Sequence, residues 1–300
     1  MASRSALPVR LIVYAVLVAI AIVDFYPIVY MAVNSSRTSV DFFQNPGGLP
    51  DAWHLDNFKA LYYRFDVLRL FGNTLLDALL AFAVTIVLSV PASFAFAKLR
   101  FPYRSGLYMI VIATMAIPGI TFVIPNFVLM SRLGLVDHPG SVILIWAVTA
   151  VPSNIFLLVA LMRGIPNEVL EAGKIDGISY VQTLARIVMP LSVPGIVTLA
   201  IFNTTGWWND LFTPLIFLQS DDLKTMTVAV ATILKRFDTD YPLLLAGLFM
   251  TSIPPIAIYV ALQSHIKKRT RHRVRQIRNG GCNDGCEAIA SGHRGRQPGR

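Results

Sequence analysis

The sequence predicts an all-α membrane protein with six transmembrane helices, and two observations carry this prediction. Of the 300 residues, 55% are hydrophobic and only 14% are charged, whereas a soluble domain carries about 25% charged residues. So few charges cannot cover a globule of this size, and its apolar surface therefore has to face lipid. The second observation is the recurrence of apolar stretches of about 20 residues, which is the length of a helix that spans a bilayer.

Each of these stretches contains at most one charged residue. In chain order they are Leu11–Val33, Asn73–Ala97, Ser105–Met130, Ser141–Met162, Leu191–Leu218 and Tyr241–Gln263. Prolines interrupt the third stretch, at Pro118 and Pro125, and the sixth, at Pro254 and Pro255. Because neighbouring helices can satisfy the carbonyls that proline leaves free, we expect kinked helices around a cavity.

The net charge of +9 is unevenly distributed and divides the chain into three parts. Residues 1–263 carry 16 Lys/Arg and 15 Asp/Glu, whereas residues 264–300 carry 10 Lys/Arg and 2 acidic residues. A nearly neutral body excludes a nucleic-acid-binding domain, and its composition excludes a soluble enzyme. We expect a short N-terminal segment (1–10), a membrane domain (11–263) and a basic, disordered tail (264–300) that contains both cysteines.

Two features of the charge distribution bear on the topology. Arg4 and Arg10 precede the first stretch as in a signal peptide, but apolar residues resume after Asp24, so we expect an uncleaved first helix. Lys/Arg residues outside the tail divide equally between the two sides of the membrane. They are densest in the short loop 98–104, on the side of the N-terminus and the tail, so we expect both termini in the cytoplasm.

The loop 163–190 joins the fourth and fifth stretches and has strong helix signals. Val169–Asp176 predicts about two helical turns, and Gly177 can adopt the left-handed conformation that ends helices. Ser179–Gln182 resembles a capping box that starts a second short helix, which we expect to end at Met189–Pro190. Small residues in the first helix would let a partner surface approach. Such a loop either docks on a partner protein or lies on lipid headgroups.

The same loop resembles a known motif. The residues Glu171-Ala172-Gly173, Gly177 and Ile187-Val188-Met189-Pro190 are similar in spacing to the EAA motif of ABC-importer permeases, which has alanine in place of Gly173 and leucine in place of Met189. In that family the loop forms a coupling helix that docks on a cytoplasmic ATPase. The resemblance implies the following coupling residues: Glu171, Ala172, Gly173, Asp176 and Gly177.

Three further stretches, Ala95–Pro102, Ser131–Leu135 and Trp208–Leu215, are similar to carbohydrate-type permeases, notably the MalG-like half. The resemblance covers residues 10–264 and implies the type I importer fold in a bacterial inner membrane, with a sugar, an oligosaccharide or a glycerol-phosphate-like compound as the solute. It implies a second, homologous permease, two copies of an ABC ATPase that bind ATP and Mg²⁺, and an extracytoplasmic solute-binding protein. The chain has no Walker A glycine loop, so we expect it to bind no cofactor or metal itself and not to be an enzyme.

The solute path is expected on the fifth stretch, where polar and aromatic side chains lie together. Aromatic faces beside amide and carboxylate groups suit sugar rings and hydroxyls, although such groups also hold helices together. The candidates are Asn203, Thr204, Trp207, Trp208, Asn209 and Asp210. A rival hypothesis is a secondary transporter of a small polar solute driven by an ion gradient, which the acids within the membrane and the broken helices also fit.

Overall fold

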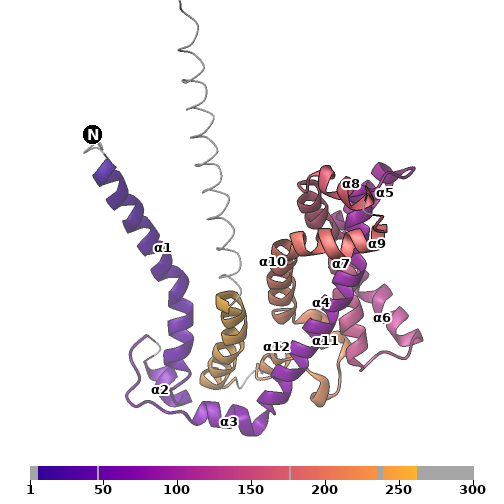
Figure 1. Cartoon of the computed structure of the whole chain (residues 1–300). Helices are drawn as coiled ribbons and strands as arrows, with labels where there is room; N and C mark the ends of the chain where they lie inside the picture. The colour runs from indigo at the N-terminus through magenta and orange to yellow at the C-terminus, as the bar shows by residue number, and fades with distance from the viewer. Residues whose placement is uncertain (1–5, 46, 176, 235–238, 262–300) are drawn as a thin grey trace, which may run out of the picture.

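The structure, a computed structural model, describes residues 6–45, 47–175, 177–234 and 239–261, and every regular element in these ranges is helical. Within them, five helices are long and apolar enough to cross a membrane, and one bent helix pair makes a sixth crossing if it counts as a single span. The five are α1 (Ala6–Asn34), α4 (Val67–Lys98), α7 (Pro139–Arg163), the stretch Tyr180–Trp208 and the helix Tyr241–Ala261. The predicted all-α membrane fold is confirmed (Figure 1).

The core of the bundle lies between α4 and α7, and α10 (Met189–Trp208) packs against both. Small side chains let the first two helices approach closely, since Ala81 of α4 and Ala147 of α7 are fully buried. Thr85 Oγ1 of α4 also donates to the Ala147 carbonyl at 3.4 Å. Small residues of this kind allow helix association in lipid, where burial of large apolar side chains adds no driving force. α4, α7 and α10 together position the two candidate sites described below, which are the 163–190 loop and a cavity beside α7 and α10.

The third predicted stretch is broken in the structure. Two helical pieces, Arg104–Ala116 and Gly119–Arg132, meet at an angle of 92°. Pro118 explains the break, because proline cannot donate a helix hydrogen bond and keeps the preceding Ile117 extended, at φ −86° and ψ 120°. The pieces consist of α5 (Arg104–Ala113), η1 (Thr114–Ala116), η2 (Gly119–Phe122) and α6 (Val123–Arg132).

The fifth helix begins earlier than predicted. α9 (Tyr180–Thr183) continues through a π-helical turn, η3 (Leu184–Val188), directly into α10. The expectation that Met189–Pro190 ends the second helix of the 163–190 loop is therefore wrong. The π-helical turn comes just before Pro190, whose missing N–H interrupts the regular hydrogen-bond ladder without stopping the helix.

The fifth helix also ends earlier than predicted, because α10 stops at Trp208 and α11 (Phe212–Phe217) is a separate short helix. Asp210, expected inside the span, lies in the break. Its Oδ1 accepts the backbone N–H groups of Phe212 at 3.0 Å and Thr213 at 3.2 Å. These donors have no partner inside a first helical turn, so the carboxylate stabilises a new helix start.

The short helices gather at the two ends of the bundle (Figure 1). One end, called the α8 end here, carries α8 (Asn167–Ile175) and the start of α1. The other, called the α3 end, carries α2 (Ser39–Gln44), α3 (Asp56–Arg64) and α12 (Met226–Ala231). η4 (Asp221–Leu223) precedes α12 in the chain.

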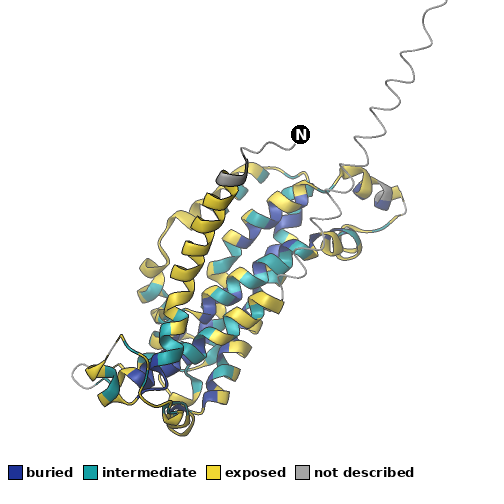
Figure 2. Cartoon of the chain, turned by 90° about the vertical axis from the view of Figure 1, so that its left-hand side faces the viewer, coloured by how far each residue is buried: buried dark blue, intermediate teal, exposed yellow. Residues whose placement is uncertain are grey.

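α1 stands apart from the bundle, and nearly all of its described side chains are exposed until its last turns (Figure 2). None of its most apolar window is buried, whereas 44% of the corresponding window of α7 is. Among the residues whose burial is described, covering begins in the last turns of α1, and the loop that follows folds around Arg37. This arginine is fully buried and donates to the carbonyls of Asn45, at 2.5 Å, and Gly48.

Candidate functional site

The 163–190 loop folds as two helical segments joined at a glycine. Gly177 has φ +75°, so the predicted left-handed residue is confirmed. The predicted capping box is also confirmed: Ser179 Oγ accepts the Gln182 N–H at 3.3 Å, and Gln182 Oε1 accepts the Ser179 N–H at 2.9 Å. The turn between α8 and α9 is therefore determined by neighbouring residues: the left-handed Gly177 follows α8, and the capping box starts α9.

Gly173 faces the chain's own next helix and not the outer surface. It is buried, and a Cβ at this position would lie 2.8 Å from Ile178 Cδ1 and 3.2 Å from Ile187 Cδ1. Ile178 N also donates to the Gly173 carbonyl at 3.1 Å. Close packing inside the loop thus explains why glycine stands where the EAA motif has its second alanine. The expectation that this residue lets a partner approach does not agree with its inward position.

The outer surface of the loop presents both charged and apolar side chains. Glu171 is exposed, and so are Ile175, Tyr180 and Val181, at 87%, 56% and 76%. Two other predicted coupling residues are not placed on this surface, because Asp176 and the side chain of Ala172 lie outside the described residues. The surface defined by the described residues combines a carboxylate with three exposed side chains that are apolar or aromatic.

The start of α8 is joined to the end of α4 by Lys98. Its Nζ donates to the Ile165 carbonyl at 2.6 Å and to Asn167 Oδ1 at 3.0 Å. Leu170 makes the apolar contact of α8 with the bundle, in a cluster that includes Val90 and Phe94 of α4. A cavity of about 590 Å³ lies beside these contacts, between the end of α4 and the loop.

A second cavity, of about 600 Å³ and called the tryptophan cavity here, lies among α6, α7, α10 and α11. The rings of Trp146 and Trp207 stack there, with centroids 5.8 Å apart and planes at 9°. Trp146 Nε1 donates to Asp210 Oδ2 at 2.7 Å. Asp210 therefore fixes the orientation of the indole while its other oxygen starts α11.

Of the six predicted solute-path residues, the structure brings three into the tryptophan cavity: Asn203, Trp207 and Asp210. Asn203 also exchanges amide hydrogen bonds with Asn154 of α7, at 2.9 and 3.4 Å. The result is a polar and aromatic wall shared by two membrane helices.

The other three predicted residues lie elsewhere. Thr204 is buried and donates to the Ala200 carbonyl. Trp208 is buried and donates to the Thr251 carbonyl at 2.9 Å, and Asn209 is exposed at the end of α10, where it donates to the Thr205 carbonyl at 2.8 Å.

The cavity has a second wall that sequence reasoning missed. Trp146, Thr149 and Ser153 of α7 line it, at spacings of three and four residues that place them on one helix face. The spacing of these polar and aromatic residues could have indicated a cavity wall. They lie in an uncharged apolar stretch, however, which by its composition predicts only a membrane span.

Comparison with known proteins identifies the family. A model of the family described as "Binding-protein-dependent transport system inner membrane component" matches residues 69–272. The chain belongs to this family. It is a permease subunit of an ABC importer and a multi-pass membrane protein, and the resemblance seen in its EAA-type loop is confirmed.

The permease has relatives that are named for carbohydrate uptake. The diacetylchitobiose uptake system permease protein of Streptomyces coelicolor is 25% identical, over 84% of each chain. The arabinooligosaccharides permease of Halalkalibacterium halodurans is 28% identical, over 82% of this chain and 89% of its own. A solved bacterial ABC transporter involved in import of the acidic polysaccharide alginate shares the fold, with a TM-score of 0.77 and 23% identity over 89% of this chain and 99% of that one.

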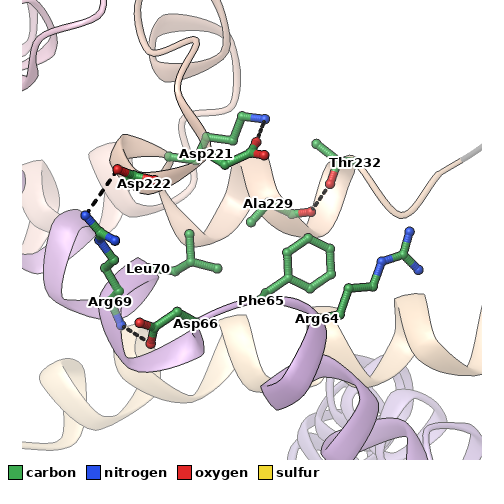
Figure 3. Close-up of a pocket in the computed structure, with 10 residues that line it drawn as sticks. Arg64, Phe65, Asp66, Arg69, Leu70, Asp221, Asp222, Ala229 and Thr232 are labelled. Carbon is green, nitrogen blue, oxygen red and sulfur yellow. Dashed lines mark hydrogen bonds and ion pairs between the residues drawn. The ribbon is translucent and has the colours of Figure 1, made fainter.

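A charged pocket of about 500 Å³ at the α3 end of the permease was also missed (Figure 3). Arg69 of α4 lies 3.4 Å from Asp222 of η4, and Lys224 lies 2.5 Å from Asp221. Asn73 donates to the carbonyls of Asp222 and Lys224, at 2.7 and 3.2 Å. These contacts join α4 to a loop about 150 residues away in the chain. From composition alone, Asp221 and Asp222 would be expected only to be exposed to solvent in a loop.

Asp137 makes a similar connection nearby. Its Oδ1 accepts the backbone N–H groups of Gln219 and Ser220, each at 2.8 Å, and its Oδ2 accepts the Ser220 hydroxyl. The Ser220 hydroxyl and backbone bonds stabilise the carboxylate, so the pKa of Asp137 lies below its usual value of 3.8. Within the described ranges, no group of three or more His, Cys, Asp or Glu residues is placed to bind a metal ion.

Proposed function

We propose that this permease forms half of the translocation path of an ATP-driven importer for a carbohydrate-class solute and that its 163–190 loop receives the motion of a separate ATPase. The observation that carries the proposal is the geometry of that loop. Two short helices joined at the left-handed Gly177 present exposed apolar and acidic side chains at one end of a membrane bundle. Exposed apolar patches rimmed by polar groups are typical of protein docking surfaces.

The residues proposed to meet the ATPase are Glu171, Ala172, Asp176 and Gly177, together with the exposed Ile175 and Tyr180. Gly173 supports them from inside by keeping α8 close to the following helix. ATP and Mg²⁺ bind on the partner ATPase in this proposal. Closure of two ATPase copies would displace the loop, and the bundle would alternate between inward-facing and outward-facing states.

The exposure of α1 supports a second permease subunit as a partner. A helix that leaves most of its apolar surface uncovered inside its own chain is available to lipid and to another membrane protein. We therefore infer that a homologous permease covers part of α1 and completes the path, and that an extracytoplasmic solute-binding protein delivers the solute to the α3 end.

The tryptophan cavity is the proposed solute contact. Its stacked indoles offer a flat apolar face, and Asn203, Ser153 and Thr149 offer the hydrogen-bonding groups that sugar hydroxyls need. The relatives named for diacetylchitobiose, arabinooligosaccharides and lactose support a sugar, an oligosaccharide or a related polar solute.

The positions of α1 and α8 determine the membrane topology that we propose. The start of α1 and α8 lie at one end of the bundle (Figure 1). If α8 meets a cytoplasmic ATPase, the N-terminus is cytoplasmic, and an even number of crossings returns the C-terminus to the same side of the bacterial inner membrane. The basic tail 264–300 lies outside the described residues.

Gentle solubilisation followed by affinity purification tests the proposal. We expect an ABC ATPase and a second permease to co-purify with the tagged chain, and ATP hydrolysis to be stimulated when the binding protein and its solute are added. Recovery of the chain alone, together with uptake driven by an ion gradient, would favour the rival secondary transporter.

A further inference from the structure

Lys98 occupies an unusual position, because one ammonium group joins three elements. It is the last residue of α4, and its Nζ donates to the Ile165 carbonyl just after α7 and to Asn167 Oδ1 at the start of α8. Both acceptors lie among the first residues of the 163–190 loop. The two hydrogen bonds together are called the Lys98 bridge here.

Other basic side chains in this region make local contacts. Arg104 Nη1 donates at 3.0 Å to the carbonyl of Leu99, in the loop that precedes it. The guanidinium of Arg163 lies over the ring of Tyr108, 5.4 Å from its centroid. Neither of these two contacts involves α8. The positive charges that suggested the orientation of the chain therefore have different structural roles, and among these three described side chains Lys98 bonds to the start of α8.

The remaining connection between α8 and α4 is apolar. Leu170 packs in the cluster that contains Val90 and Phe94, and a cavity of about 590 Å³ lies beside it, lined by both α8 and the end of α4. The bridge holds the start of α8 on one side of this cavity, and Leu170 holds its apolar face. A charge-assisted hydrogen bond is roughly twice as strong as a neutral one and is directional, so the bridge resists movement that Leu170 alone would permit.

We propose that Lys98 is a positioning residue that passes displacement of the 163–190 loop to α4, the central helix of the bundle. The inference rests on the proposed function, since it needs an ATPase that moves the loop. It adds a residue outside the EAA-type motif to the coupling machinery. A permease without the bridge would still bind its ATPase and permit hydrolysis, but its membrane helices would no longer follow the nucleotide state.

The test measures helix movement and needs no knowledge of the solute. Cys282 and Cys286 are replaced by serine, and Ser153→Cys places one thiol in the wall of the tryptophan cavity. The complex purified with its ATPase is then labelled with a maleimide, with and without ATP and vanadate. With Lys98 present, we expect the labelling rate to change at least about threefold between the two states, as expected if the cavity opens and closes.

In the Lys98→Met background, we expect this nucleotide-dependent change to disappear while ATPase co-purification and ATP hydrolysis persist. Lys98→Arg keeps a charged donor and should restore the change. Asn167→Ala removes one acceptor at an exposed residue and should reduce the change by about half, since one of two hydrogen bonds remains. Arg100→Met removes an exposed positive charge two residues away and serves as the matched control.

The results of these labelling experiments distinguish failure of the Lys98 positioning role from failure of the proposed function. A Lys98→Met complex that labels like its parent overturns the positioning role, as does equal loss of labelling change and hydrolysis, which indicates a structural defect. If Lys98→Met does not assemble, an Asn167→Ala result identical to the parent overturns the role as well. Absence of any nucleotide effect in the parent would instead contradict the proposed function, and the positioning role would fall with it.

Discussion

The two ends of the permease are held together in different ways. At the α3 end, polar side chains join segments distant in the chain: Asp137 bonds to residues 219 and 220, Asn73 to residues 222 and 224, and Arg69 pairs with Asp222. At the α8 end, Lys98 bonds to the start of the 163–190 loop, Leu170 and Val188 of the loop pack in one cluster with Val90 of α4, and the loop continues directly into α10. The first end is tied together by polar contacts within its own chain, whereas the loop at the second end leaves exposed apolar side chains for a partner.

The largest expected effect comes from a substitution at Gly177, which has a matched control at a second left-handed glycine, Gly134. Gly177 and Gly134, with φ +75° and +67°, lie at opposite ends, and a Cβ at either would meet no atom within 4 Å. A side chain at either position therefore costs about 1–2 kcal/mol of backbone strain and nothing in packing. We expect Gly177→Lys to reduce the ATPase recovered with the permease by about tenfold or more.

Gly134→Lys is the matched control and should leave ATPase recovery within about twofold of the parent, because the same strain is placed far from the loop. Membrane insertion, measured by fractionation, should be unchanged for both variants. Equal losses of ATPase would show that backbone strain anywhere disturbs assembly, and the contrast between the two ends would fail.

The next effect concerns the pair of asparagines on α10. Asn203→Ala leaves the buried Oδ1 of Asn154 without its donor, which costs about 1–3 kcal/mol, although Asn154 Nδ2 keeps its bond to the Ala150 carbonyl. We expect uptake of labelled lactose or diacetylchitobiose, whichever the parent transports, to fall about tenfold. Asn209→Ala, at an exposed helix end outside the cavity, should have little effect. If Asn209→Ala is the more damaging change, the solute contact lies beyond α10 and not in the tryptophan cavity.

A smaller effect is expected from Asp137, and it depends on pH. Its lowered pKa means that the folded state favours the carboxylate, so this stabilisation is present above pH 3.8 and is lost as the pH falls through the lower folded-state pKa. Asp137→Asn should lower Tm at neutral pH, and the difference from the parent should shrink in acid. The exposed Asp51→Asn is the control. A difference in Tm that is constant with pH would contradict the role of the charge.

The smallest effect is expected for Arg69 and Asp222, which are both more than half exposed. Exposed ion pairs contribute about 0.2–1 kcal/mol. A double-mutant cycle with Arg69→Met and Asp222→Asn, evaluated from thermal unfolding, should give a coupling energy in this range that decreases with salt. A larger coupling would mean that the pair is the main connection of η4 to α4, in place of the Asn73 hydrogen bonds.

Much of the fold was predictable because its signals are local. Apolar length gave the spans, Gly177 the end of α8, and Ser179 with Gln182 the start of α9. Where the prediction failed, the cause was a polar group acting on the backbone. Asp210 was expected to lie within a span, but its carboxylate accepts two N–H groups and starts a separate helix, so the fifth span is shorter than its apolar stretch.

The candidate sites were predictable in part for the same reason. The EAA-type spacing identified the loop, but only the packing of Ile178 and Ile187 shows why Gly173 is needed there. Trp207 and Asp210 were candidates because they stand close together in the sequence. Their partner Trp146 lies 64 residues from Asp210, and hydropathy contains no information about a pairing of that kind.

The contacts between α2 and the last span have a consequence for how the chain is made. Phe42 of α2 stacks on Tyr241, and Ser39 of α2 donates to Asp240, a residue 201 positions later. Asn57 of α3 donates to the carbonyls of Ser35 and Arg37, directly after α1, and these bonds can form as soon as α3 has been made. α2 also leaves the ribosome early, but its partners belong to the start of the last span. The docking of α2 on that span is therefore a late step of biogenesis, and a chain truncated before Asp240 would lack it.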